Sequence, residues 1–201
     1  VALAALALLP LAHAVEAQDT RAIQAREAQR ADDRTLAYLA RFRAALVEKF
    51  GADPWLSMLT WTENEGSALV HASPTAPATH VIWQEGKWIS TDGHQLKPWA
   101  TAADPAVSRF RLSAVTEKFL RERFPAHRAQ PSRATDFLMS TSVRYFGKPF
   151  DRVILEIQVG SMTGFGISAV AFDLATGASL DVNAAIADAR TQRAEAARKD
   201  A

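Results

Sequence analysis

The stretch DRTLAYLARFRAALVEKF, residues 33–50, decides the fold that we predict. Its large apolar residues recur at the three- and four-residue spacing of one helical face. They are Leu36, Leu39, Phe42, Leu46 and Phe50. Asp32 or Asp33 can cap the start of a helix here, and Gly51 can end it. The pattern predicts an amphipathic helix that buries its apolar face.

Four short extended segments are expected after this helix, at about residues 55–62, 67–72, 80–84 and 87–91. The last two flank the turn at Glu85 and Gly86. A two-residue turn would place Trp83 opposite Trp88, whereas a G1 bulge at Gly86 would make the two indoles diagonal neighbours. The sequence leaves both registers open.

The second half of the chain repeats this order of elements. A shorter apolar-striped helix is expected at about 113–124, followed by strands at about 136–145, 152–159, 167–172 and 178–182. Each meander would be antiparallel and covered by its own helix. The predicted fold class is therefore α+β, with two helix-plus-antiparallel-meander units that suggest an internal duplication.

The expected domain organisation follows from these units. It comprises a signal peptide at 1–17, a helical spacer at 18–32, a first α+β unit with its linker at 33–105, a second unit at 106–183 and a polar Ala/Arg tail at 184–201.

The N-terminus predicts export. Residues 1–12, VALAALALLPLA, form a short apolar run, and Ala12 to Ala14 has the A-x-A pattern of a signal peptidase site. Because no Met or basic residue precedes the run, we expect the signal peptide to be N-terminally truncated in this sequence. The predicted location is periplasmic or secreted. The alternative is an uncleaved anchor in the inner membrane, in which case the chain would contact the membrane.

The segment AFDLATGASL, Ala171 to Leu180, resembles the final hairpin of exported modules of the PepSY type. In these modules a helix precedes an antiparallel meander that ends in a D-x-x-T-G-x-x-L-like turn. The resemblance implies binding or inhibition of secreted or envelope proteins rather than catalysis, and it supplies no catalytic residue.

Several chemistries are disfavoured. The chain has no cysteine, which excludes disulfides and thiolate nucleophiles. It lacks the G-x-S-x-G, P-loop, G-x-G-x-x-G and H-E-x-x-H motifs. Its 23 basic and 22 acidic residues give a net charge of +1, so we expect no nucleic-acid partner. His71, His80 and His94 would be the ligands of a three-imidazole zinc site, but no carboxylate is fixed nearby to orient them, and we predict no metal and no cofactor.

The tryptophans are the candidate binding residues. We expect them either to fill the core and pair across strands or to form an aromatic platform for a partner. The candidates for such a platform are Trp61, Trp83, Trp88 and Trp99.

The sequence predicts an exported, non-catalytic binding module, monomeric or weakly dimeric. Its partner would be another envelope or secreted protein, or a polymer. The alternatives are a hydrolase without a recognisable motif, which would use scattered acids or the histidines, and a membrane-tethered structural accessory domain.

Overall fold

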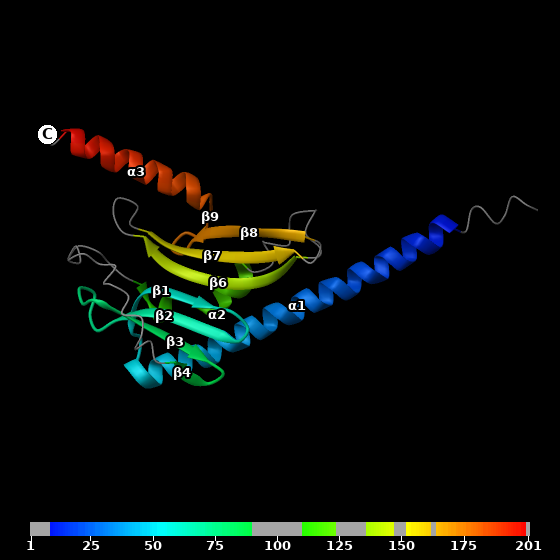
Figure 1. Ribbon diagram of the computed structural model, residues 1–201, viewed down its shortest axis with the longest axis horizontal. Coiled ribbons are helices and arrows are strands. Elements are labelled where there is room, and N and C mark those ends of the chain that lie inside the picture. The colour runs from blue at the N-terminus through cyan, green and yellow to red at the C-terminus, as the bar shows by residue number, and fades with distance from the viewer. Residues whose placement is uncertain (1–8, 90–109, 124–135, 147–151, 162–163, 200–201) are drawn as a thin grey trace, which may run out of the picture.

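One antiparallel sheet and a long helix dominate the computed structural model, which describes residues 9–89, 110–123, 136–146, 152–161 and 164–199 (Figure 1). The helices are α1 (Leu9–Phe50), the 3-10 turn η1 (Leu112–Ala114), α2 (Glu117–Arg123) and α3 (Val182–Lys199). The strands in these ranges are β1 (Trp55–Trp61), β2 (Glu65–His71), β3 (Ala78–Gln84), β4 (Lys87–Ile89), β5 (Phe110–Arg111), β6 (Asp136–Phe146), β7 (Arg152–Ser161), β8 (Gly164–Asp173) and β9 (Ser179–Leu180). The predicted α+β class is confirmed.

The two meanders are joined edge to edge. The strand order is β4-β3-β2-β1-β6-β7-β8-β9, and β5 pairs with the first two residues of β1. Every pair in this order is antiparallel, including β1 with β6. The strands of both halves therefore form one sheet with a shared core.

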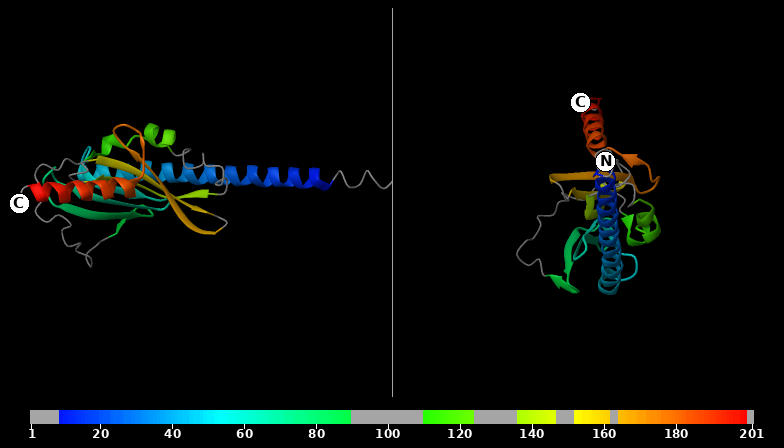
Figure 2. Two further views of the ribbon diagram at one scale, coloured as in Figure 1. Left: turned by 90° about the horizontal axis from the view of Figure 1, so that it is seen from above. Right: turned by 90° about the vertical axis from the view of Figure 1, so that its right-hand side faces the viewer.

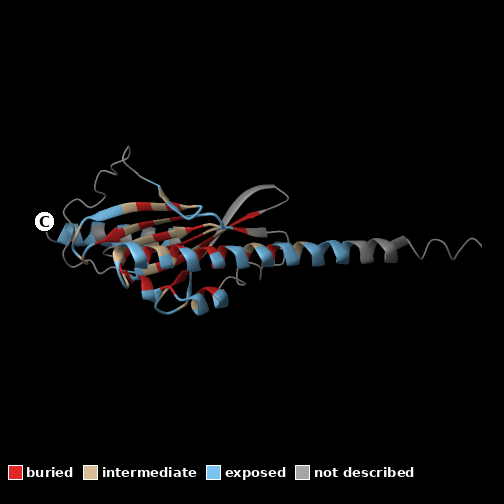
Figure 3. Cartoon of the chain, turned by 90° about the horizontal axis from the view of Figure 1, so that it is seen from below, coloured by how far each residue is buried: buried red, intermediate tan, exposed pale blue. Residues whose placement is uncertain are grey.

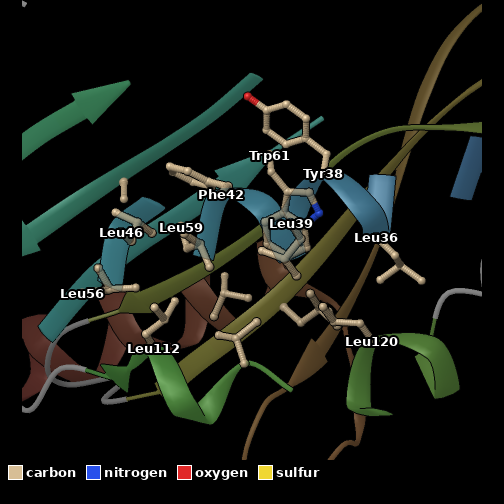
Figure 4. Packing of buried hydrophobic residues seen from close by; sticks show 14 of the residues in the cluster. Leu36, Tyr38, Leu39, Phe42, Leu46, Leu56, Leu59, Trp61, Leu112 and Leu120 are labelled. Carbon is tan, nitrogen blue, oxygen red and sulfur yellow. The ribbon is translucent and has the colours of Figure 1, made fainter. Parts of the chain in front are cut away.

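The register aligns the buried side chains in rows across this sheet. One row reads Trp83, Gly66, Trp61, Thr141, Ile157 and Val170. The next reads Val81, Ala68, Leu59, Val143, Leu155 and Phe172. Because side chains alternate between the faces of a strand, these rows share one face. The apolar residues of α1 belong to the same core cluster as these rows, as Figure 4 shows.

Helix α1 is longer than the sequence predicts. Its last part is the helix expected over 33–50, and the expected spacer over 18–32 continues the same helix toward the N-terminus. This N-terminal half extends beyond the sheet, and its described residues are mostly exposed (Figures 2 and 3). None of the helices in the described part of the chain is long and apolar enough to cross a membrane.

The second helix is shorter than predicted. The segment expected to be helical over 113–124 divides into η1 and the seven-residue α2. Both lie beside α1. The Arg43 guanidinium donates to the Val115 carbonyl oxygen, and Arg121 lies 3.8 Å from the Asp33 carboxylate. Leu112, Val115 and Leu120 complete the core that α1 forms with the sheet.

The β3–β4 turn resolves the register that the sequence left open. Glu85 has φ 50° and Gly86 has φ 79°, as a two-residue type I′ turn requires. Trp83 therefore lies directly opposite Trp88.

Candidate binding groove and a second pocket

The structure does not bring the candidate tryptophans together on one surface. Trp61 is fully buried and Trp83 is 7% exposed, so both belong to the core. Trp83 is stacked on Phe42 with ring centroids 5.9 Å apart, and its carbonyl oxygen accepts a hydrogen bond from the Tyr38 hydroxyl at 2.7 Å. These two tryptophans thus take the core role that the sequence left open, and Trp83 keeps only a small surface beside the groove described below. Trp99 and His94 lie outside the described residues.

Among the candidate tryptophans that the structure describes, Trp88 keeps the largest accessible surface. Its side chain is half-buried on β4, at the edge of the described sheet. Phe50 meets its ring edge-on with centroids 5.9 Å apart, and Phe42 lies 6.4 Å away. The Lys49 ammonium nitrogen lies 4.7 Å from the centroid of the indole, within cation–π range. The indole is thus fixed in one orientation by contacts with α1.

A groove runs beside Trp88, between α1 and the β3–β4 hairpin. Its volume is about 740 Å³. The lining residues are Arg41, Ala44, Ala45, Glu48 and Lys49 from α1, and Trp83, Gly86 and Trp88 from the hairpin. The two alanines leave space between helix and hairpin that larger side chains would fill.

The charge of the groove is mixed, with a cationic excess. Its lining includes two cationic side chains, those of Arg41 and Lys49, and one carboxylate, that of Glu48. The predicted apolar stripe of α1 does not include these three residues, so the sequence does not predict the groove. The signal available in the sequence was the pair Ala44 and Ala45 between charged residues, which is too common a pattern to be specific.

A second pocket of about 680 Å³ lies where β1 begins and β2 ends. Its lining includes Phe50, Asp53, Trp55, Val70, His71 and Arg111. The Arg111 guanidinium carbon lies 4.6 Å from the Trp55 ring centroid. The Asp53 carboxylate accepts hydrogen bonds from the backbone N–H and hydroxyl of Ser113, at 2.6 and 2.8 Å, which fixes this wall of the pocket.

His71 joins two segments at the second pocket. Its Nδ1 lies 2.9 Å from the Ala76 carbonyl oxygen, and its Nε2 lies 2.8 Å from Ser57 Oγ. His80 instead pairs with Ser67, at 3.2 Å. No group of three or more histidine, aspartate or glutamate side chains that could hold a metal ion occurs among the described residues.

Two side chains of α1, the core residue Tyr38 and the partly buried Arg43, have shifted pKa values. Burial raises the pKa of the Tyr38 hydroxyl to about 12, and Glu65 adds to this effect, whereas Arg41 opposes it. Burial also lowers the pKa of the Arg43 guanidinium, against the opposing effect of Asp53 and Glu117. Both groups connect α1 to its neighbours, so these shifts reflect packing of the helix.

Similarity to known proteins adds no evidence about the role of these two pockets. No protein-family model, no curated protein and no solved structure matches the chain.

Proposed function

We propose that this chain is an exported binding module that recognises a partner protein at the groove beside Trp88. The observation that carries the proposal is the fixed, half-buried indole of Trp88 at the edge of an open groove. Aromatic residues of this kind contribute most to protein interfaces, because they offer a large contact area and lose little conformational entropy.

The side chains around the groove favour one kind of partner. Arg41 and Lys49 favour an acidic side chain, while the indole and the two alanines favour an apolar one. The proposed ligand is therefore a segment of another envelope or secreted protein that presents an acidic residue next to an apolar or aromatic residue.

The proposal of export rests on the N-terminal sequence. The apolar run of residues 1–12 and the A-x-A pattern at Ala12 to Ala14 are typical of a secretory signal, and they support a groove that works in the periplasm or outside the cell. Intact mass of the exported product tests this, with a mature start near Val15 or Gln18 as the expected result. A mass that retains the apolar run would instead mean an anchor.

We also propose that the chain is PepSY-like and arose by duplication. Two features support this. The sheet consists of two four-strand meanders, β1 to β4 and β6 to β9, each preceded by a helix in the chain. Asp173, Thr176 and Gly177 form the turn of the last hairpin. Members of that family act by binding, which agrees with the proposed task of the groove.

Affinity capture from a periplasmic extract, followed by mass spectrometry, tests the binding proposal. Lys49→Glu reverses a charge in the groove and should reduce the recovered partner at least tenfold. Lys118→Glu is the matched control, because Lys118 is 86% exposed on α2 and lies outside the groove. Equal recovery by both variants, or recovery of a polymer without any protein, would overturn the proposal.

A further inference from the structure

His71, which lines the second pocket, is hydrogen-bonded to Ser57, which lies behind it on β1. The Ala76 carbonyl oxygen can only accept, so His71 Nδ1 must carry the proton of that 2.9 Å hydrogen bond. In the neutral imidazole, His71 Nε2 is then the unprotonated ring nitrogen and accepts from the Ser57 hydroxyl at 2.8 Å. In this arrangement a neutral imidazole is ready to take a proton from a serine.

We propose that Ser57 and His71 form a nucleophile and general base for acyl transfer from a carboxylic ester. This inference goes beyond the proposed binding function and does not rest on it. A serine becomes a nucleophile when a base within hydrogen-bond distance takes its proton and a third group holds that base in place. Here the third group is the Ala76 carbonyl, which fixes the histidine tautomer as a carboxylate does in other serine enzymes.

The local backbone explains why Ser57 reaches His71. The pairing of β1 with β2 shifts between Leu56 and Met58, so Ser57 is the additional residue of a β-bulge. Trp55 lies opposite His71 in the ladder, and the bulge turns the next polar side chain toward the same imidazole. Bulges of this kind redirect side chains, and they occur often next to active sites.

The second pocket determines the class of substrate. His71 forms part of its wall, together with the apolar Phe50, Pro54, Trp55 and Val70. A volume of about 680 Å³ falls in the range of small-molecule sites. The proposed substrate is a small ester, with its acyl group placed against these apolar residues.

The proposed reaction balances without a further reagent. Ser57 Oγ attacks the carbonyl carbon while His71 Nε2 takes the hydroxyl proton. The bond between that carbon and the alkoxy oxygen breaks, and the same proton passes to the leaving alcohol. Water then attacks the acyl-serine, His71 takes a proton from it and returns it to Ser57 Oγ, and the carboxylic acid is released.

Ser67 and His80 provide a control within the same chain. Their hydrogen bond is longer, at 3.2 Å, and no hydrogen bond orients the other ring nitrogen of His80 in the part of the chain that the structure describes. Ser67 should therefore stay unreactive under conditions in which Ser57 reacts.

Labelling of the folded full chain with a fluorophosphonate probe, followed by peptide mass spectrometry, tests the proposal. We expect modification at Ser57 and none at Ser67, together with hydrolysis of p-nitrophenyl acetate that Ser57→Ala abolishes. His71→Asn keeps a donor for the Ala76 carbonyl but removes the base, so labelling should slow by about 100-fold. The control variant Lys118→Glu should label as fast as the native chain, because Lys118 is exposed on α2 and lines neither pocket.

Two results would overturn the inference. One is a folded native chain in which Ser57 reacts no faster than Ser67. The hydrogen bonds of Ser57 and His71 would then only stabilise the β2–β3 loop. The other is a folded His71→Asn variant that labels at the native rate. The first comparison uses the native chain alone, so it stands even where a variant is unstable.

Discussion

Gly66 lies on β2 between Trp61 and Trp83 of the two neighbouring strands. The ring of Phe42, which is fully buried, fills the space above it. A Cβ atom at position 66 would lie well inside van der Waals contact of the Phe42 ring. At this residue the absence of a side chain allows α1 to approach the sheet.

Substituting Gly66 should therefore weaken the contact between α1 and the sheet. We expect Gly66→Ala to destabilise the fold by roughly 1–3 kcal/mol, as other overpacked cores do. The urea midpoint measures this. In a Phe42→Leu background the same substitution should cost less, because the flexible leucine can move aside. An equal loss of stability in both backgrounds would contradict the close contact between position 66 and the Phe42 ring.

Tyr38 should titrate far above the ordinary range. Burial raises its pKa from 10 to about 12 in the folded chain, so folding favours the neutral phenol. Its contribution to stability is complete below pH 10 and is lost as the pH rises from 10 through 12.

Ultraviolet absorbance of the tyrosinate measures this titration, with Tyr38→Phe as the reference that leaves only Tyr145. The difference between the two proteins should show a phenol that ionises near pH 12. A component that ionises near pH 10 while circular dichroism still reports a folded chain would contradict the burial of this hydroxyl.

The last hairpin is the element that the sequence described best. Asp173 Oδ1 accepts from the backbone N–H groups of Ala175 and Thr176, both at 2.9 Å, and Gly177 has φ 69°. These local bonds explain why the segment signals a turn in the sequence. Its contact with Arg123 of α2 was not predictable, because it depends on a residue distant in the chain.

The Asp173 side chain should therefore stabilise the fold more by accepting hydrogen bonds than by its negative charge. Asp173→Ala removes both hydrogen bonds and should destabilise the chain by roughly 1–3 kcal/mol. Asp173→Asn keeps the Oδ1 acceptor and loses only the weak attraction to Arg152 at 3.7 Å, so its effect should be smaller. Thermal unfolding compares the two, and equal losses would contradict this ranking.

The helices show where local sequence is insufficient. The apolar stripe located the part of α1 that packs on the sheet. Residues 18–32 lack such a stripe, yet they continue the helix because they are rich in Ala, Arg, Gln and Glu. The second helix starts late, because Ser113 belongs to η1 and is hydrogen-bonded to Asp53. Thr116 Oγ1 accepts from the Phe119 N–H at the start of α2.

At the scale of the whole molecule, the sequence predicts each meander but not their union. Short turns make consecutive strands antiparallel neighbours, so β1 to β4 and β6 to β9 follow from the pattern. The pairing of Leu59 with Val143, which joins the halves, involves residues far apart in the chain. Local periodicity contains no information about such a contact.

The same distinction applies to the candidate sites. The abundance of tryptophan indicated Trp88 as a candidate. It could not distinguish Trp88 from the buried Trp61 and Trp83, because burial depends on which face of the sheet packs against α1. Ser57 gave no signal in the sequence, since its partnership with His71 depends on the bulge in β1.

Trp88→Ala tests the central claim of a binding groove most directly, when its urea midpoint and its yield in partner capture are measured together. Trp55→Ala is the matched control, because Trp55 is also half-buried but lies outside the groove. The account predicts that Trp88→Ala loses partner capture at least tenfold, with a loss of stability below the roughly 3–5 kcal/mol typical of buried aromatic residues, while Trp55→Ala keeps capture. A folded Trp88→Ala variant that captures the partner as well as Trp55→Ala would contradict it.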